Sequence, residues 1–312
     1  MRLGIDLGGT NIAVGLVNEH GRVIYKKSTP TLADRSAEQI INDIVNLCNV
    51  VCSECQASLN CLDSIGIAVP GGVEVATGTV VFTPNIPFSG INIADILSKK
   101  LCYNRVGVIN DANAALLAEM KTGSAVNCRD IVMITIGTGI GGAIAIDGKI
   151  VNGINGMAGE IGHLVIQKNG KECSCGRRGC FETYASATAL MNLTRQEIDN
   201  CRTNGEYTVM SEATELNARI AFDAYKQGDN AAKRVIHEYI DALSCGIVSL
   251  INIFQPDLFV IGGGVSGEKE FLINLINPYF ITEQYSRAAD KKTILTTAQC
   301  GNDAGIIGAA FA

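Results

Sequence analysis

Four side chains that could ligate a metal ion lie close together in the stretch GHLVIQKNGKECSCGRRGC: His163, Cys173, Cys175 and Cys180. One histidine and three cysteines form the nitrogen and sulfur set that Zn²⁺ prefers. Basic residues among these ligands favour the thiolate form of the cysteines: Lys171, Arg177 and Arg178. Because four protein ligands leave zinc no open coordination position, we predict a structural zinc ion rather than a Lewis acid.

Two carboxylates flank this metal-binding sequence. Glu160 lies three residues before His163, and Glu182 lies two residues after Cys180. Carboxylates accept hydrogen bonds from hydroxyl groups, so a pair at the ends of a clamped loop indicates polyol recognition. The alternative is that both side chains are simply exposed to solvent, as most glutamates are.

A further carboxylate stands where a strand is predicted to meet a helix. Asn110 and Asp111 follow the apolar run VGVI and precede ANAALLAEM, which is typical of a helix. At such a junction in an open α/β sheet, Asp111 could accept a hydroxyl proton as a general base. It could also be the N-cap of the helix, and both roles can hold together.

Three glycine-rich turns could hold phosphate groups, since glycine lets the backbone approach a ligand closely and successive N–H groups form an anion-binding nest. The first turn is DLGGTN, in which Asp6 could orient a hydrated Mg²⁺ ion. The second is IGTGIGGA, and the third is FVIGGGVS, between a predicted strand and helix. Ordinary hairpins or close packing of elements are the alternatives. The candidate nucleotide-binding residues are Asp6, Gly8, Gly9, Thr10, Asn11, Gly137, Thr138, Gly139, Gly141, Gly263 and Gly264.

The elements around the first two turns repeat. The runs LGID, IAVGLV and RVIYKK are rich in β-formers, and IVMITIG, GAIAIDG and KIVNG repeat the same pattern of strand, glycine turn, strand, tight turn, strand. A dinucleotide-binding fold would require a helix directly after the glycines, whereas a strand follows them here. We therefore predict an internal duplication that gives two α/β domains facing across a cleft.

Composition excludes several classes of protein. The chain has 312 residues, 47% of them hydrophobic, and a net charge of −6, which argues against a broad surface for nucleic acid or an anionic membrane. The N-terminus lacks an apolar signal run, and apolar stretches are interrupted before membrane-spanning length, so we expect a cytoplasmic protein. Among twelve cysteines, Cys48, Cys52 and Cys55 share one face of a predicted helix. Core packing is the expected role there, and a second metal or redox site is the alternative.

Taken together, the motifs resemble the ROK family (repressor, open reading frame, kinase), in family order and over essentially the whole chain. They are DLGGTNIAVGLV, GIAVPGGV, NDANAALLAE, ITIGTGIGGAI, NGMAGEIGH and CSCGRRGCFETYAS. The resemblance implies a sugar kinase with the actin-like ATPase (ribonuclease H-like) fold, most similar to the bacterial glucokinases of the family. We place an N-terminal domain at residues 1–110, completed by a C-terminal helix at about 300–312, and a C-terminal domain with the zinc loop at 111–299.

The resemblance also implies roles for individual residues. Asp111 matches the catalytic base, which deprotonates the sugar 6-hydroxyl for attack on the γ-phosphate of ATP. His163 matches both a zinc ligand and a sugar contact. The other positions that match sugar contacts are Gly71, Asn85, Asn110, Glu160 and Glu182. The implied cofactors are ATP, Mg²⁺ and structural Zn²⁺.

The implied activity is phosphorylation of glucose, with N-acetylmannosamine or another hexose as alternative substrates. A non-catalytic sugar sensor is the alternative of another class. The chain has no tryptophan, whereas many family glucokinases carry one near the position of Phe88. Family repressors have an additional N-terminal DNA-binding domain, and we expect none here because the first glycine hairpin begins at residue 4. Members of the family usually form homodimers, so the resemblance also implies a homodimer.

Overall fold

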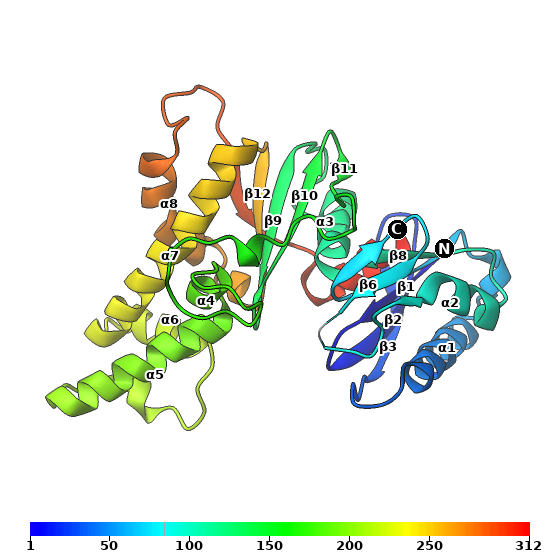
Figure 1. The fold of residues 1–312 in the computed structure, drawn as a ribbon, viewed down its shortest axis with the longest axis horizontal. Helices are drawn as coiled ribbons and strands as arrows, with labels where there is room; N and C mark the ends of the chain where they lie inside the picture. The colour runs from blue at the N-terminus through cyan, green and yellow to red at the C-terminus, as the bar shows by residue number, and fades with distance from the viewer. Residues whose placement is uncertain (84) are drawn as a thin grey trace. The chain divides into compact units, whose positions relative to one another are not determined.

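The computed structural model describes residues 1–83 and 85–312, which form two compact units (Figure 1). The first unit contains residues 1–129, 143–159 and 299–312, and the second contains 130–142 and 160–298. The boundary expected between residues 110 and 111 lies inside the first unit, where a strand meets a helix.

The first unit is built on a five-stranded sheet with the order β3-β2-β1-β4-β8. Its strands are β1 (Arg2–Leu7), β2 (Asn11–Val17), β3 (Val23–Pro30), β4 (Ser64–Val69) and β8 (Val106–Asn110). The first three strands are antiparallel, whereas β1, β4 and β8 run parallel to one another. The carboxyl ends of these three parallel strands therefore meet at one edge of the sheet, where Asp6, Gly71 and Asp111 lie.

Side chains of β1 alternate between the two faces of this sheet. Leu3, Ile5 and Leu7 are fully buried in a core shared with helix α1 (Ala37–Glu54). Gly4 points to the other face, where a β-carbon would lie 1.8 Å from the backbone oxygen of Ile306. Helix α9 (Ala304–Ala310) thus lies directly on the strands and also packs against α3 (Asp111–Thr122).

Helix α1 begins and packs as its sequence indicates. Ser36 accepts a hydrogen bond from the backbone of Gln39, whose side chain accepts one from the Ser36 backbone in return, so the two form a capping box. Cys48 and Cys52 are buried in the core, and Cys55 packs against it. Core packing of these cysteines is therefore confirmed. Figure 1 shows α1 and α2 (Ile93–Leu101) beside the same sheet.

Smaller elements complete the first unit. A three-stranded sheet has the order β5-β6-β7 and contains β5 (Gly72–Glu74), β6 (Thr79–Phe82) and β7 (Ile91–Asn92). Two 3₁₀ helices also belong to this unit: η1 (Leu59–Cys61) and η5 (Gly301–Asp303).

The second large sheet has the order β11-β10-β9-β12-β13. Its strands are β9 (Ile131–Ile136), β10 (Ile140–Ile146), β11 (Lys149–Ile150), β12 (Leu258–Gly263) and β13 (Ile294–Thr297). Strand β12 runs parallel to both β9 and β13. The chain passes from the second unit to the first within β10. The succession β9, glycine turn, β10, tight turn, β11 confirms the predicted repeat of the opening pattern, although β11 is only two residues long.

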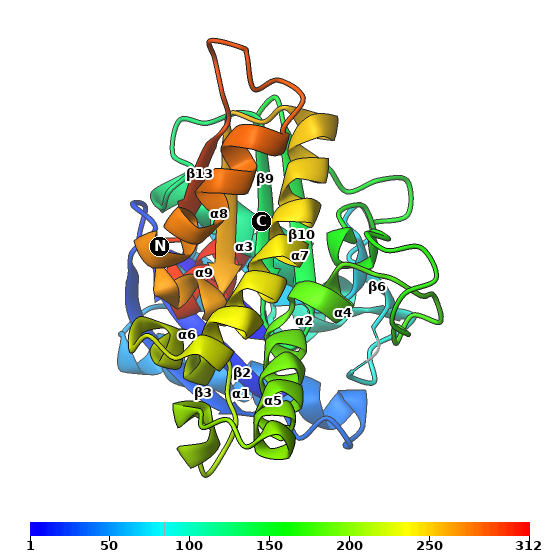
Figure 2. The same ribbon diagram turned by 90° about the vertical axis from the view of Figure 1, so that its left-hand side faces the viewer.

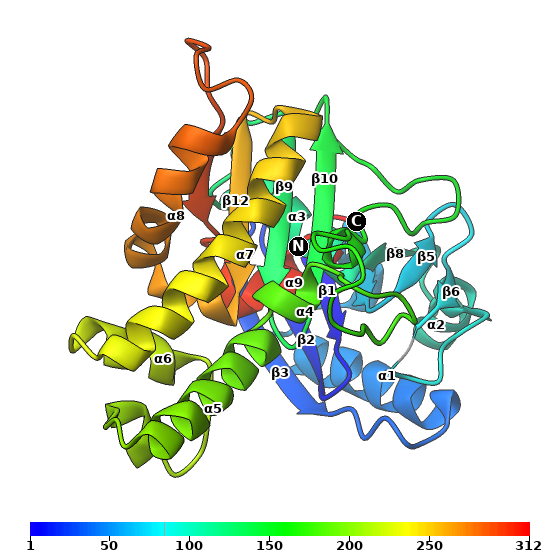
Figure 3. The ribbon, with the colours of Figure 1, turned by 60° about the vertical axis from the view of Figure 1, so that its left-hand side comes forward.

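Helices of the second unit gather beside β12 and β13. They are α4 (Glu182–Ala185), α5 (Ala187–Asn204), α6 (Arg219–Lys226), α7 (Asn230–Phe254) and α8 (Glu270–Glu283), with the 3₁₀ helices η2 (Ile161–His163), η3 (Val209–Glu212) and η4 (Gly264–Glu268). Helices α7 and α8 lie in front of these strands in Figure 2, and α5 and α6 lie against α7 in Figure 3. Helix α7 is long and apolar enough to cross a membrane, but 56% of its apolar window is buried within the protein, as in a core helix.

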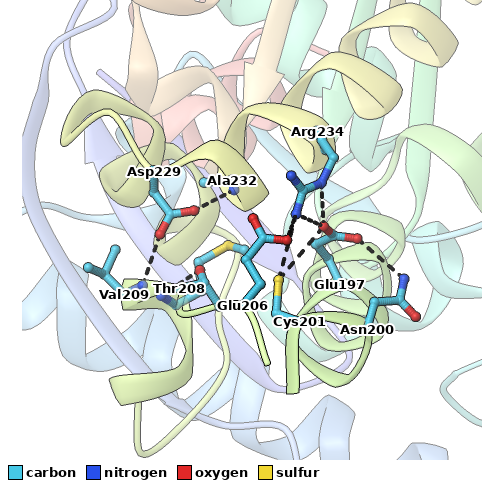
Figure 4. A network of polar contacts seen from close by, with 10 residues as sticks. Glu197, Asn200, Cys201, Glu206, Thr208, Val209, Asp229, Ala232 and Arg234 are labelled. Atoms are coloured by element: carbon cyan, nitrogen blue, oxygen red, sulfur yellow. Dashed lines mark hydrogen bonds and ion pairs between the residues drawn. The ribbon is translucent and has the colours of Figure 1, made fainter. Parts of the chain in front are cut away.

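A polar network fastens α5 and η3 to α7 (Figure 4). The guanidinium of Arg234 lies 2.6 Å from Glu197 and 2.8 Å from Glu206. Asp229 caps α7 by accepting from Ala232 N at 2.8 Å, and its other oxygen accepts from Val209 N at 2.9 Å. These contacts hold α5 and η3 against α7, and none of the residues in them is a candidate site residue.

Candidate active site and metal centre

The histidine and three cysteines predicted as zinc ligands come together in the second unit. Their ligand atoms all lie within 4.8 Å of one another, with Cys175 Sγ 3.7 Å from Cys180 Sγ and Cys173 Sγ 3.6 Å from His163 Nδ1. In a tetrahedral zinc site with bonds of about 2.3 Å to sulfur, ligand atoms stand roughly 3.5–3.8 Å apart. The four residues therefore fit zinc, and His163 offers Nδ1 to it, which leaves Nε2 free for another partner.

The backbone between the cysteines forms tight turns. Cys173 N donates to Arg177 O at 2.9 Å, and Gly176 N donates to Cys173 O at 3.0 Å. Gly179 has a left-handed backbone (φ +85°), and a β-carbon there would lie 1.7 Å from Gln167 O. The CxCGxxGC spacing is thus the sequence of a folded knuckle, with a left-handed glycine after Cys175 and another directly before Cys180.

The electrostatics of the three thiols differ. Burial raises the pKa of Cys173 to about 12 and also raises the pKa of Cys180, whereas the backbone N–H of Arg177 lowers the pKa of Cys175. A cation is therefore needed to hold all three as thiolates. The positive charge of Arg177 acts to lower the pKa of Cys175 and, against the larger effect of burial, that of Cys180, whereas Arg178 pairs with Glu172 and Lys171 lies over the ring of Tyr184.

Glu182 and Glu160 have different surroundings. Glu182 Oε1 lies 3.2 Å from Cys173 Sγ and 3.7 Å from His163 Nδ1, and its side chain is only 18% exposed. Glu160 is exposed and precedes η2 without making a side-chain cap. The structure thus places Glu182 in contact with the metal ligands, whereas the side chain of Glu160 is exposed and makes no helix cap.

Asp111 is held at the start of α3 in the first unit. Its Oδ1 accepts from Ala112 N at 2.8 Å and from Asn110 Nδ2 at 2.9 Å. The same Asn110 amide donates to Gly71 O at 2.9 Å, and its oxygen accepts from Asn113 N. The N-cap of α3 is therefore Asn110 and not Asp111, so the sequence interpretation of Asp111 as a possible cap is wrong. As the first helical residue, Asp111 also lies at the positive end of the helix dipole.

Asp6 stands beside Asp111 within the first unit. Burial, followed by the negative charge of Asp111, raises the pKa of Asp6 from 3.8 to about 6. A β-carbon on Gly305 would lie 2.4 Å from this carboxylate, so glycine at the start of α9 makes room for it. Two neighbouring carboxylates supply the hard oxygen ligands that Mg²⁺ prefers, and the residues present fit such an ion.

The first two predicted glycine turns are the tips of hairpins, as expected. In the first, Gly8 N donates to Asn11 O at 2.9 Å, while Thr31 Oγ1 donates to Gly8 O at 2.7 Å. In the second, Gly137 N donates to Gly139 O at 3.0 Å. The remaining members of these turns lie as follows: Gly9, Thr10 and Thr138 are exposed at the tips, Asn11 begins β2, and Gly141 lies within β10.

The third glycine run lies between a strand and a helix, as predicted. The helix that follows β12 directly is the 3₁₀ helix η4, and the α-helix α8 begins at Glu270. Gly263 has φ +80°, and a β-carbon on it would lie 2.4–2.7 Å from backbone atoms of Ile136, so glycine at this position allows two strands to approach closely. Gly264, by contrast, has open space around it.

Two predicted sugar contacts lie in the first unit. Position 71 (φ +92°) requires glycine, because a β-carbon there would lie 2.1 Å from Phe82 O. Asn85 is exposed, and its β-carbon lies near Gly9.

One buried carboxylate was not singled out from the sequence. Glu119 in α3 is fully buried and accepts four hydrogen bonds, from Ser124 N and Oγ and from the backbone of Gln299 and Cys300, at 2.6–2.9 Å. A β-carbon on Gly123 would lie 2.1 Å from it. The combination of a glutamate in an apolar helical run with a following Gly-Ser is the signal that could have found it.

Relatives define the class of this protein. Its two mixed α/β sheets match the actin-like fold seen in a ROK family glucokinase from Streptomyces griseus solved with glucose and AMPPNP (TM-score 0.83, 31% identity, 99% of this chain and 98% of that one). The ROK family model matches residues 2–312, and the chain belongs to the ROK family.

Named relatives in the family have two kinds of function. A glucokinase of Thermotoga maritima is 34% identical over 99% of this chain and 95% of that protein. A xylose repressor of Caldicellulosiruptor bescii is 30% identical over 85% of this chain and 66% of that protein. Family membership therefore establishes the fold and the motifs, and the choice between kinase and sensor depends on the site residues.

Proposed function

We propose that this protein is a hexose kinase that transfers the γ-phosphoryl group of ATP to the 6-hydroxyl of glucose. The observation that carries the proposal is the arrangement around Asp111. Its carboxylate is held by the Asn110 amide and by Ala112 N, at the sheet edge where Asp6 also lies. A fixed carboxylate beside a second one whose pKa is raised suits a general base at a sugar hydroxyl next to a magnesium site, and this supports catalysis rather than sugar sensing alone.

Phosphoryl transfer depends on positioning and on neutralisation of charge. In the proposed reaction, Asp111 accepts the proton of the 6-hydroxyl as its oxygen attacks the γ-phosphorus, and ADP leaves. Backbone N–H groups of the turns at Gly8–Asn11 and Gly137–Gly139 bind the phosphates. Mg²⁺, when bound, would offset the charge on the phosphate oxygens, and Asp6 would orient its water shell.

Recognition of the sugar is assigned to a separate set of side chains. Asn110 and Gly71 are already joined by a hydrogen bond, which fixes their positions for a hydroxyl contact. The proposed ring contacts in the second unit are Glu160, His163 through Nε2, and Glu182, and Asn85 is a further contact. Zn²⁺, when bound by His163, Cys173, Cys175 and Cys180, would fix the loop that carries the first three. The motifs are consistent with a cytoplasmic enzyme of carbohydrate metabolism.

The test is a coupled assay of ADP release over a panel of hexoses and N-acetylhexosamines, run beside calorimetric titrations of the same sugars. We expect turnover with glucose and little with N-acetylmannosamine. Sugar binding without ADP release from any sugar would overturn the proposal in favour of a sensor. Turnover only with N-acetylhexosamines would keep the kinase and reject glucose as its substrate.

A further inference from the structure

The glycine turn between β9 and β10 lies against a carboxylate from the metal loop. A β-carbon built on Gly139 would lie 2.5 Å from Glu182 Oε2 and 3.6 Å from its Cδ. A β-carbon on Gly137 would meet nothing within 4 Å, although both glycines belong to the same turn. Neither has a left-handed backbone, so conformational freedom does not explain Gly139. Glu182 occupies the space where a side chain at position 139 would lie, and this explains why the residue there is glycine.

Glu182 is confined from the opposite side as well. Its Oε1 lies 3.2 Å from Cys173 Sγ and 3.7 Å from His163 Nδ1. Its backbone is fixed by neighbours, since Phe181 N donates to Leu164 O at 2.7 Å and Ala187 N donates to Gly137 O at 2.9 Å. A methyl group at position 139 would therefore move the carboxylate, because the strand and the backbone of α4 are the more rigid parts.

We propose that Gly139 is a positioning residue for sugar recognition: its missing side chain keeps the Glu182 carboxylate in place beside His163. The turn that the motif assigns to phosphate thus also fixes a sugar ligand. This inference rests on the proposed function, because it takes Glu182 as a ligand of ring hydroxyls. It differs from a role in phosphate binding alone, which would predict no effect on sugar affinity in the absence of nucleotide.

The expected effect follows from the cost of a misplaced charged hydrogen bond. Such a bond contributes roughly 1.5–3 kcal/mol, which corresponds to about a 10- to 100-fold change in affinity. Gly139→Ala should therefore weaken sugar binding at least about tenfold when no nucleotide is present. The matched variant Gly137→Ala adds the same methyl group where space is open and should leave sugar affinity within about twofold.

The experiment has two readouts, sugar affinity by calorimetry and the visible absorption of protein loaded with Co²⁺ in place of zinc. Tetrahedral Co²⁺ reports changes around its ligands, and Glu182 contacts two of these. Gly139→Ala should alter the spectrum, whereas Gly137→Ala should not. In a Glu182→Ala background, Gly139→Ala should add no further loss of affinity and no further spectral change.

Each outcome separates the two proposals. Equal sugar affinity and spectrum in Gly139→Ala and wild type would overturn the positioning role. The same holds if Gly139→Ala and Gly137→Ala lose affinity alike, or if the Gly139→Ala effect persists without the Glu182 side chain. If wild-type protein binds no sugar at all, the proposed function fails, while the Co²⁺ spectra still decide whether Gly139 positions Glu182.

Discussion

Asp6 gives the sharpest quantitative prediction. Burial and the nearby charge of Asp111 raise the pKa of Asp6 from 3.8 to about 6 in the folded protein. Because the folded chain binds the proton more tightly than the unfolded chain, stability falls as the pH rises between these two values. Above pH 6 the ionised carboxylate destabilises the protein. A shift of about two pKa units at about 1.4 kcal/mol each amounts to roughly 3 kcal/mol.

The perturbation is Asp6→Asn, which keeps the shape of the side chain and cannot ionise. We expect the variant to be more stable than wild type by roughly 1.5 kcal/mol at pH 5 and roughly 3 kcal/mol at pH 7.5. For a unit of this size, each 1 kcal/mol raises the unfolding midpoint by about 2–4 °C. Activity should fall at the same time, because a residue that destabilises the fold at neutral pH is retained for function.

The assay is scanning calorimetry of both proteins at pH 5, 6, 7 and 8, with zinc retained and without added Mg²⁺ or nucleotide. Asp34→Asn, which removes an exposed carboxylate, controls for the change in net charge. Two results would refute the reasoning: an Asp6→Asn variant less stable than wild type at pH 7.5, or a stability difference that stays constant across the pH series.

Three other substitutions test separate parts of the site. Asp111→Asn should lower kcat by about 10²- to 10⁴-fold while sugar binding persists, and a variant with more than about a tenth of wild-type turnover would exclude a general base there. Cys175→Ser should remove about one zinc ion per chain and weaken sugar binding, as measured by metal analysis and calorimetry; retained zinc would mean that the ligand set is wrong. Glu119→Ala should cost about 3 kcal/mol of stability in denaturant unfolding, because three part-buried backbone N–H groups and a hydroxyl lose their acceptor.

The parts of the fold that depend on local sequence could be predicted. Strands after the glycines of DLGGTN and TGIGG follow from their β-branched residues, and these turns are hairpin tips in the structure. Helix α1 starts at the Ser36 cap that its sequence offers. The spacing of His163 and the three cysteines identified the metal cluster because a short knuckle brings them together with few long-range contacts.

Features set by contacts between distant segments could not be predicted in the same way. Asn110 rather than Asp111 caps α3, and the choice depends on the Gly71 carbonyl, which lies 39 residues earlier in the chain. The sequence places Gly263 in a glycine run before a predicted helix, but it does not show that a β-carbon there would meet the backbone of Ile136 on another strand. The donors to Glu119 from Gln299 and Cys300 lie about 180 residues from it. Sequence patterns around each residue contain none of this information.

The contact between Gly139 and Glu182 changes what zinc loss should do. From motifs alone, the glycine turn binds nucleotide and the metal loop binds sugar, so losing zinc would spare nucleotide affinity. In the structure, one oxygen of Glu182 faces Cys173 and His163 while the other faces Gly139, and Ala187 just beyond α4 donates to Gly137 O. A loop released from its metal would therefore disturb the turn that carries Gly137 and Gly139. Zinc should then support the nucleotide turn and the sugar contacts together, through a single carboxylate.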